Sequence, residues 1–160
     1  MRWIWIDKFT EFTPKTSATA IKNVSLAEEH LHDLYPAFPI VPHSLIVEGM
    51  AQTAGILVGE ARGFKEKVIL AKIGRATFHR LVRPGDTIQF NAKIDQLNEH
   101  GASIRGTVMT GTDLVAEIEL MFSHIDQNLG GMKFPEHNFV FTEQFTELLK
   151  TYRMDTGVTI

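Results

Sequence analysis

The chain has 160 residues, of which 44% are hydrophobic and 22% are charged, and its formal net charge is −3. These values predict one soluble globular domain, and the charge favours neither nucleic acid nor a membrane surface as a partner. The absence of cysteine excludes disulfides, thiolate metal sites and cysteine nucleophiles. No stretch approaches the roughly 20 apolar residues that span a bilayer, and the apolar N-terminal run is too short for a signal peptide, so we expect a cytoplasmic protein.

Residues 2–24 are predicted to be extended. Trp3–Ile6 is an aromatic and β-branched run that favours a first strand, Thr13–Lys15 favours a turn, and Ser17–Val24 alternates like a second strand. From Ser25 to Pro42 the prolines indicate an ordered loop without regular structure.

A helix is predicted from Ser44 to Arg62, with Ser44 as its cap and Gly63 at its end. Apolar side chains cover most of its circumference, and Gly49, Gly55 and Gly59 recur near one face. Such a helix is buried on most sides, and its small residues indicate that a neighbouring element packs very closely against it.

Four further strands are predicted after the helix: Val68–Ile73, Thr87–Leu97, Ala102–Thr110 and Leu114–Ile125. Their short connections favour an antiparallel sheet, so the predicted fold class is α+β. We expect residues 1–125 to form this domain and residues 126–160 to form a C-terminal extension. In that extension Thr142–Arg153 favours a short amphipathic helix that packs on the body through Phe145, Leu148 and Tyr152, where it could cover the mouth of a tunnel.

The segment from Tyr35 to Gln52 resembles the signature of the β-hydroxyacyl-acyl carrier protein dehydratases. That signature reads His-Phe-Pro-Gly-x-Pro-x-x-Pro-Gly-x-Leu-x-x-Glu-x-Met-Ala-Gln, and the similarity extends over roughly residues 3–124. The resemblance implies a hotdog fold, in which an antiparallel sheet wraps one long central helix. It also implies a dimer with shared active sites, where one subunit supplies a loop histidine and the other supplies a helix carboxylate.

The sequence departs from the signature at its histidine and at both of its glycines, of which the one in the loop becomes Ala37. The family's catalytic histidine falls on Leu34, and the glycine after the third proline falls on His43, whereas Glu48 and Gln52 match. Glu48 is therefore the candidate general acid, since burial favours a protonated carboxyl; the alternative is a structural ion pair with an arginine. His43 is the candidate for the backbone oxyanion donor and the replacement base, or else a partly exposed histidine at a helix start. His32 is the next candidate base.

Other residues are candidates for binding. Gln52 could hydrogen-bond Glu48 or serve as a plain buried amide, and Tyr35, Phe38 and Phe78 could line an acyl tunnel or belong to the core. Positive charge gathers between residues 62 and 83, where Arg75, Arg80 and Arg83 could bind an acidic acyl carrier protein or a coenzyme A phosphate. Such a run is also typical of a solvated face. The other histidines lack ligand-like spacing, so we expect no metal and no cofactor.

The resemblance implies a (3R)-hydroxyacyl-thioester dehydratase of fatty acid metabolism, acting on an acyl carrier protein or coenzyme A thioester. Two alternatives remain: an acyl-thioester hydrolase, whose carboxylate activates water and which would tolerate Leu34 better, and a non-catalytic acyl-binding subunit. We expect a homodimer, because a small hotdog domain leaves a sheet edge to pair, and dimers could assemble into a trimer of dimers.

Overall fold

The computed structural model describes residues 4–125, 138 and 140–157. Its elements follow the chain in the order β1 (Lys8–Thr13), β2 (Ser17–Asn23), α1 (His30–Asp33), α2 (His43–Ala61), β3 (Lys67–Phe78), β4 (Thr87–Leu97), β5 (Gly101–Thr110), β6 (Asp113–Ile125) and α3 (Glu143–Thr156). The strands form one antiparallel six-stranded sheet in the order β1-β2-β4-β5-β6-β3. The α+β prediction is confirmed.

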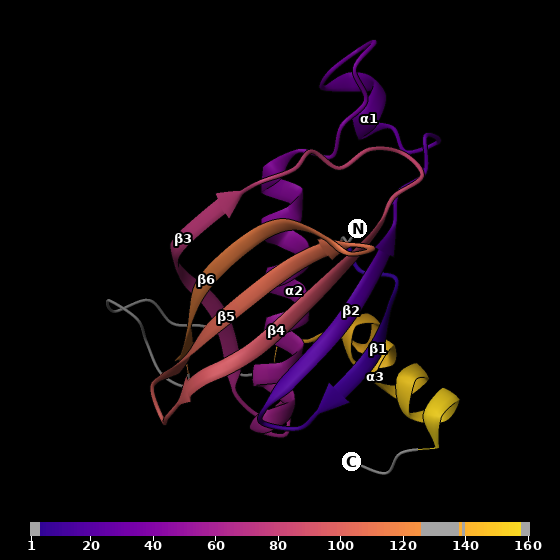
Figure 1. The fold of residues 1–160 in the computed structure, drawn as a ribbon. Coiled ribbons are helices and arrows are strands. Elements are labelled where there is room, and N and C mark those ends of the chain that lie inside the picture. The colour runs from indigo at the N-terminus through magenta and orange to yellow at the C-terminus, as the bar shows by residue number, and fades with distance from the viewer. Residues whose placement is uncertain (1–3, 126–137, 139, 158–160) are drawn as a thin grey trace.

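The sheet curves around α2, which lies against one face of all the central strands (Figure 1). Strand alternation places Ile88 and Phe90 of β4, and Ile118 and Leu120 of β6, in the core beneath the helix. At the opposite edges of the sheet lie β3 and β1, and α3 packs beside β1. The arrangement is the predicted sheet wrapped around one long helix.

Helix α2 is buried along most of its length, as its composition predicts. The ring of Phe90 fills the space over Gly49, where a Cβ atom would overlap it. Gly59 likewise receives the ring of Phe141. The predicted cap is wrong: Pro42 holds the N-cap position, and its carbonyl accepts the backbone N–H of Leu45 at 3.0 Å. The helix therefore begins one residue earlier than expected, because proline favours the extended backbone that precedes a helix.

Three other differences from the sequence predictions are larger than one residue. The first strand begins at Lys8 and does not include residues 4–6, since the backbone N–H of Trp5 bonds the side chain of Gln52 instead of a neighbouring strand. Residues 2 and 3 lie outside the described residues. The loop before α2 contains the one-turn helix α1. Strand β3 runs five residues past Ile73, where exposure on both faces hides the alternating pattern.

The C-terminal helix α3 lies within one to three residues of the predicted amphipathic segment. Leu149 is fully buried, and Phe145, Leu148 and Tyr152 pack against the core. Tyr152 meets the ring of Phe12 on β1 at 6.4 Å between centroids. Within the described part of the chain, no helix has the length and apolar character needed to cross a membrane.

Candidate functional site

The carboxyl group of Glu48 is held at the end of a chain of two hydrogen bonds. Gln52, one turn later on the same face of α2, donates from Nε2 to Glu48 Oε1 at 2.7 Å. The Oε1 atom of Gln52 in turn accepts the backbone N–H of Trp5 at 2.7 Å. Gln52 is buried and Glu48 is half-buried. Because a backbone group fixes the orientation of the amide, the amide presents its N–H to the carboxylate and orients it.

Glu48 lies at the edge of an apolar cavity of about 280 Å³ between α2 and the edge strand β3. This volume is near the lower end of the range for small-molecule sites. Apart from Glu48 and Gln52 the lining is apolar, and it comes from α2, β3, β6 and the C-terminal segment: Glu48, Ala51, Gln52, Gly55, Ile56, Val68, Ile69, Leu70, Phe122, Val140, Phe141 and Phe145. The cavity can therefore hold a hydrocarbon chain whose reactive end meets a carboxyl group.

His43 is the first residue of α2 and is exposed. Its ring stacks flat on that of Phe78 at the end of β3, with the centroids 4.0 Å apart and the planes 2° apart. The first N–H groups of a helix have no partner within the helix and lie at its positive end, so this end suits a developing negative charge. His43 and Phe78 do not line the cavity beside Glu48 in the same subunit.

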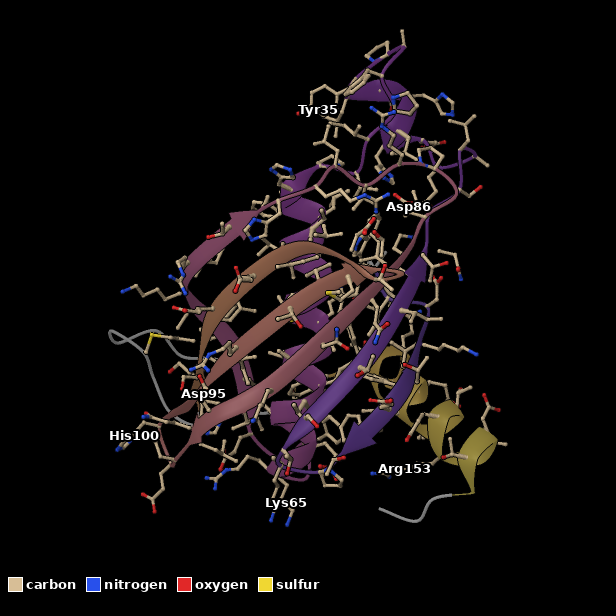
Figure 2. The ribbon with its side chains drawn as sticks, in the orientation of Figure 1. Tyr35, Lys65, Asp86, Asp95, His100 and Arg153 are labelled. Atoms are coloured by element: carbon tan, nitrogen blue, oxygen red, sulfur yellow. The ribbon has the colours of Figure 1, made fainter. Side chains whose placement is uncertain are left out.

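The loop that carries Leu34 projects beyond the end of the sheet, and Figure 2 shows Tyr35 at this extremity. Leu34, Tyr35 and Phe38 are each about half exposed, and none of them lines the Glu48 cavity. His32 turns back on its own loop, with Nε2 2.5 Å from the carbonyl oxygen of Leu26. Of the predicted substrate-binding residues, the structure brings only Gln52 to Glu48.

Ala37 supports the alignment of this loop with the dehydratase signature. Its φ is +68°, a left-handed backbone conformation that glycine adopts without strain and alanine rarely adopts. The signature has glycine at this position. The backbone at Ala37 is therefore one that the glycine of the signature would adopt without strain.

The three arginines predicted to bind a carrier lie in different surroundings. Arg75 pairs with Glu119 at 2.7 Å, and Arg80 lies 3.5–3.6 Å from two aspartate side chains. The guanidinium of Arg83 lies over the ring of Phe38, 5.0 Å from its centroid. Arg83 thus belongs to the same projecting loop region, whereas neighbouring acids offset much of the charge of Arg75 and Arg80.

A sequence model described as the FabA-like domain matches residues 3–119. The chain belongs to the FabA-like family. The 3-hydroxyacyl-[acyl-carrier-protein] dehydratases FabZ of Rickettsia bellii and Rickettsia rickettsii are each 37% identical to it over 117 residues, which are 72% of this chain and 81% of each relative. The resemblance predicted from the Tyr35–Gln52 segment is confirmed.

Solved structures confirm the predicted hotdog fold. A dehydratase heterocomplex from Xenorhabdus doucetiae matches with a TM-score of 0.65 at 13% identity, over 78% of this chain and 84% of that one. A thioesterase from Haemophilus influenzae matches with a TM-score of 0.60 at 17% identity, over 73% and 76%. A Streptococcus mutans protein bound to acetyl CoA matches with a TM-score of 0.59 at 14% identity, over 73% of this chain and 86% of that one. At these identities the likeness concerns the fold alone.

Sequence reasoning missed the apolar wall of the cavity and the support that Trp5 gives to Gln52. A partial signal existed on α2, since Glu48, Gln52 and Gly55 follow one another at the spacing of a single helix face. The small and polar side chains on that face were the local signal that could have indicated a cavity beside it. The strand and C-terminal residues opposite give no comparable local pattern.

Proposed function

We propose that this protein removes water from (3R)-hydroxyacyl thioesters carried by acyl carrier protein, as an enzyme of fatty acid synthesis in the cytoplasm. One observation supports this above all: Glu48, oriented by Gln52, lies at the polar end of an apolar cavity. A 3-hydroxyacyl chain has the matching shape, with its hydroxyl group beside the thioester and its hydrocarbon beyond. The FabZ relatives carry the name of this activity.

In the proposed reaction a base takes the proton from the carbon next to the thioester carbonyl, and negative charge develops on the carbonyl oxygen. The bond from the third carbon to its hydroxyl oxygen then breaks. Glu48 gives that oxygen a proton, so that water leaves and a carbon–carbon double bond forms. The backbone N–H of His43 stabilises the developing oxyanion, and its imidazole serves as the base in place of the histidine replaced by Leu34.

The proposed assembly is a homodimer paired through β3. This edge strand exposes Leu70 and Ile73, by 39% and 48%, and an unpaired edge of this kind is a surface on which another strand can add. If two copies pair antiparallel with Leu70 facing Arg75, then Phe78, three residues further, faces Lys67. Lys67 precedes the strand residues that line the Glu48 cavity. The His43–Phe78 stack of one subunit would thereby come beside the cavity of the other.

An acyl-thioester hydrolase is the second candidate. Hydrolysis by this site needs a carboxylate to activate water and an oxyanion donor, so it could proceed with Leu34 where the family has histidine. The exposed, apolar Leu34 side chain is the observation that favours it.

A panel of 3-hydroxyacyl and saturated acyl thioesters separates the two functions. The purified protein should form the enoyl thioester, detected by its ultraviolet absorbance, without releasing free thiol. Thiol release from saturated substrates without enoyl formation would refute the dehydratase function and support the hydrolase function. Neither product, with any chain or carrier, would refute both and leave an acyl-binding role.

A further inference from the structure

Asn138 anchors the C-terminal segment to the loop between α2 and β3. The side-chain amide of Asn138 donates to the carbonyl oxygens of Phe64 at 3.0 Å and Glu66 at 3.1 Å, between α2 and β3. Its Oδ1 atom accepts the backbone N–H groups of Val140 and Phe141, both at 3.1 Å. One residue thus joins the extension to the loop between α2 and β3 and positions Val140 and Phe141.

Phe141 then enters a recess in α2 that only glycine provides. A Cβ atom at Gly59 would overlap the Phe141 ring, and Phe64 meets the same ring edge-on at 5.1 Å. Helix α3 begins directly afterwards and is secured by the buried Leu149. Because of these contacts, Phe141 and Phe145, which form the aromatic wall of the cavity, are packed against the rest of the domain.

Phe141 lines the cavity near the C-terminal end of α2, whereas Glu48 lines it nearer the N-terminal end of that helix. Gly59 lies eleven residues after Glu48 in the sequence, which corresponds to about 16 Å along α2 at 1.5 Å per residue. Between them the cavity stays open at Gly55, where a Cβ atom would make only ordinary contact, 3.6 Å from the Phe122 ring. Val140, Phe141 and Phe145 also lie beyond residue 119, where the match to the FabA-like domain ends.

We propose that Phe141 and Phe145 set the upper length of the acyl chain, so that the protein accepts short and medium-length chains and excludes long ones. The inference rests on the proposed acyl-thioester function. It assigns the C-terminal extension a role in specificity, because the end of the hydrocarbon chain would meet these two rings.

Two substitutions change the cavity in opposite directions. Phe141→Ala removes the end wall, and Gly55→Leu fills the middle of the cavity from α2. Leu148→Ala is the matched control, since Leu148 is an apolar residue of the same extension that packs on the core without lining the cavity. Circular dichroism and thermal unfolding establish which variants are folded.

The readout is kcat/KM for 3-hydroxyacyl thioesters from hydroxybutyryl to hydroxypalmitoyl length. Wild type should lose activity towards the long end. Phe141→Ala should raise the ratio of long-chain to short-chain kcat/KM by about tenfold or more, Gly55→Leu should lower it, and Leu148→Ala should leave it unchanged. An unaltered ratio in folded Phe141→Ala and Gly55→Leu variants would overturn the proposal, as would efficient turnover of the longest substrate by wild type.

Calorimetric binding of saturated acyl coenzyme A thioesters separates this inference from the proposed activity. If no substrate is dehydrated, wild type should still bind shorter chains more tightly than long ones, and Phe141→Ala should reduce that difference. Binding that ignores chain length in both proteins, or an absence of binding, would refute the length limit independently of catalysis.

Discussion

The orientation of the Glu48 carboxyl depends on Gln52 and Trp5, and only the first of these could be predicted from the sequence. Gln52 follows it in the matched motif, and the hydrogen bond between the two side chains was among the expected roles. Trp5, which fixes Gln52 through a backbone N–H, lies 47 residues away and donates a group that every residue except proline possesses. No residue-type pattern could have revealed this contact.

Substitution at Glu48 and His43 tests the assignment of acid and base. Glu48→Gln keeps an oxygen that can accept from Gln52 but removes the transferable proton, so kcat should fall by about 10²–10⁴-fold with little change in the unfolding temperature. His43→Ala should cause a similar loss if the imidazole is the base. Steady-state kinetics with thermal unfolding of each variant measures both effects.

His32→Ala is the matched comparison for the His43 variant. Because its ring faces the carbonyl oxygen of Leu26 in the loop, we expect near wild-type turnover. The opposite pattern, with His32→Ala inactive and His43→Ala active, would move the base to His32 and leave His43 its backbone N–H alone. Full activity in Glu48→Gln would show that the family mechanism does not operate in this protein.

At the level of elements, α2 was the most predictable part of the molecule because its glycines and apolar residues are consecutive in the sequence. Its start was displaced by one residue, since Pro42 rather than Ser44 provides the cap. Strand β3 was predicted too short because the pattern used for strands needs one buried face, and residues 71–75 are exposed. The position of Phe141 depends on Gly59, which is distant in sequence. The sequence predicted only the amphipathic helix that follows Phe141.

The glycines of α2 provide an element-scale prediction. Gly49→Ala introduces a Cβ atom where the buried Phe90 ring lies, and overpacking of this kind costs about 1–3 kcal/mol. Gly55→Ala introduces the same atom into ordinary contact, so the gain in helix propensity should stabilise the protein by about 0.5–1 kcal/mol. Chemical denaturation should therefore change the unfolding free energies of the two variants in opposite directions. Equal destabilisation would mean that α2 needs glycine at Gly55 too.

At the scale of the whole molecule, Arg80 of the predicted carrier-binding arginines lies 3.5 Å from Asp86, and Figure 2 shows Asp86 and Asp95 at opposite ends of the sheet. Reversing Arg75, Arg80 and Arg83 to glutamate should weaken binding of acyl carrier protein, more at low salt than at high salt, because exposed charges are screened over about 10 Å at 0.1 M. Arg105→Glu, at the ion pair with Asp95, is the control and should have little effect. An equal loss of carrier affinity in the triple variant and in Arg105→Glu, or an affinity independent of salt, would contradict a specific docking surface.

The proposed dimer is tested by light scattering at micromolar protein concentration. Wild type should have twice the mass of the chain, and Ile73→Lys on the exposed edge of β3 should shift it towards monomer by placing like charges across the pairing axis. If the active site is shared, the same variant should lose turnover while the monomer stays folded. A wild-type monomer with full activity would refute the shared site.

The order of strands in the sheet also bears on how the protein acquires its cavity during synthesis. Strand β3 precedes β4, β5 and β6 in the chain, yet its partner is β6, so Lys67 pairs with Ile125 across 58 residues. Pairings so distant in sequence carry a large loop-closure cost and are slow to form. The β3 side of the cavity cannot be fixed until the last strand has left the ribosome and joined the sheet. A nascent chain truncated before β6 should therefore bind no acyl group, although α2 with Glu48 is already complete.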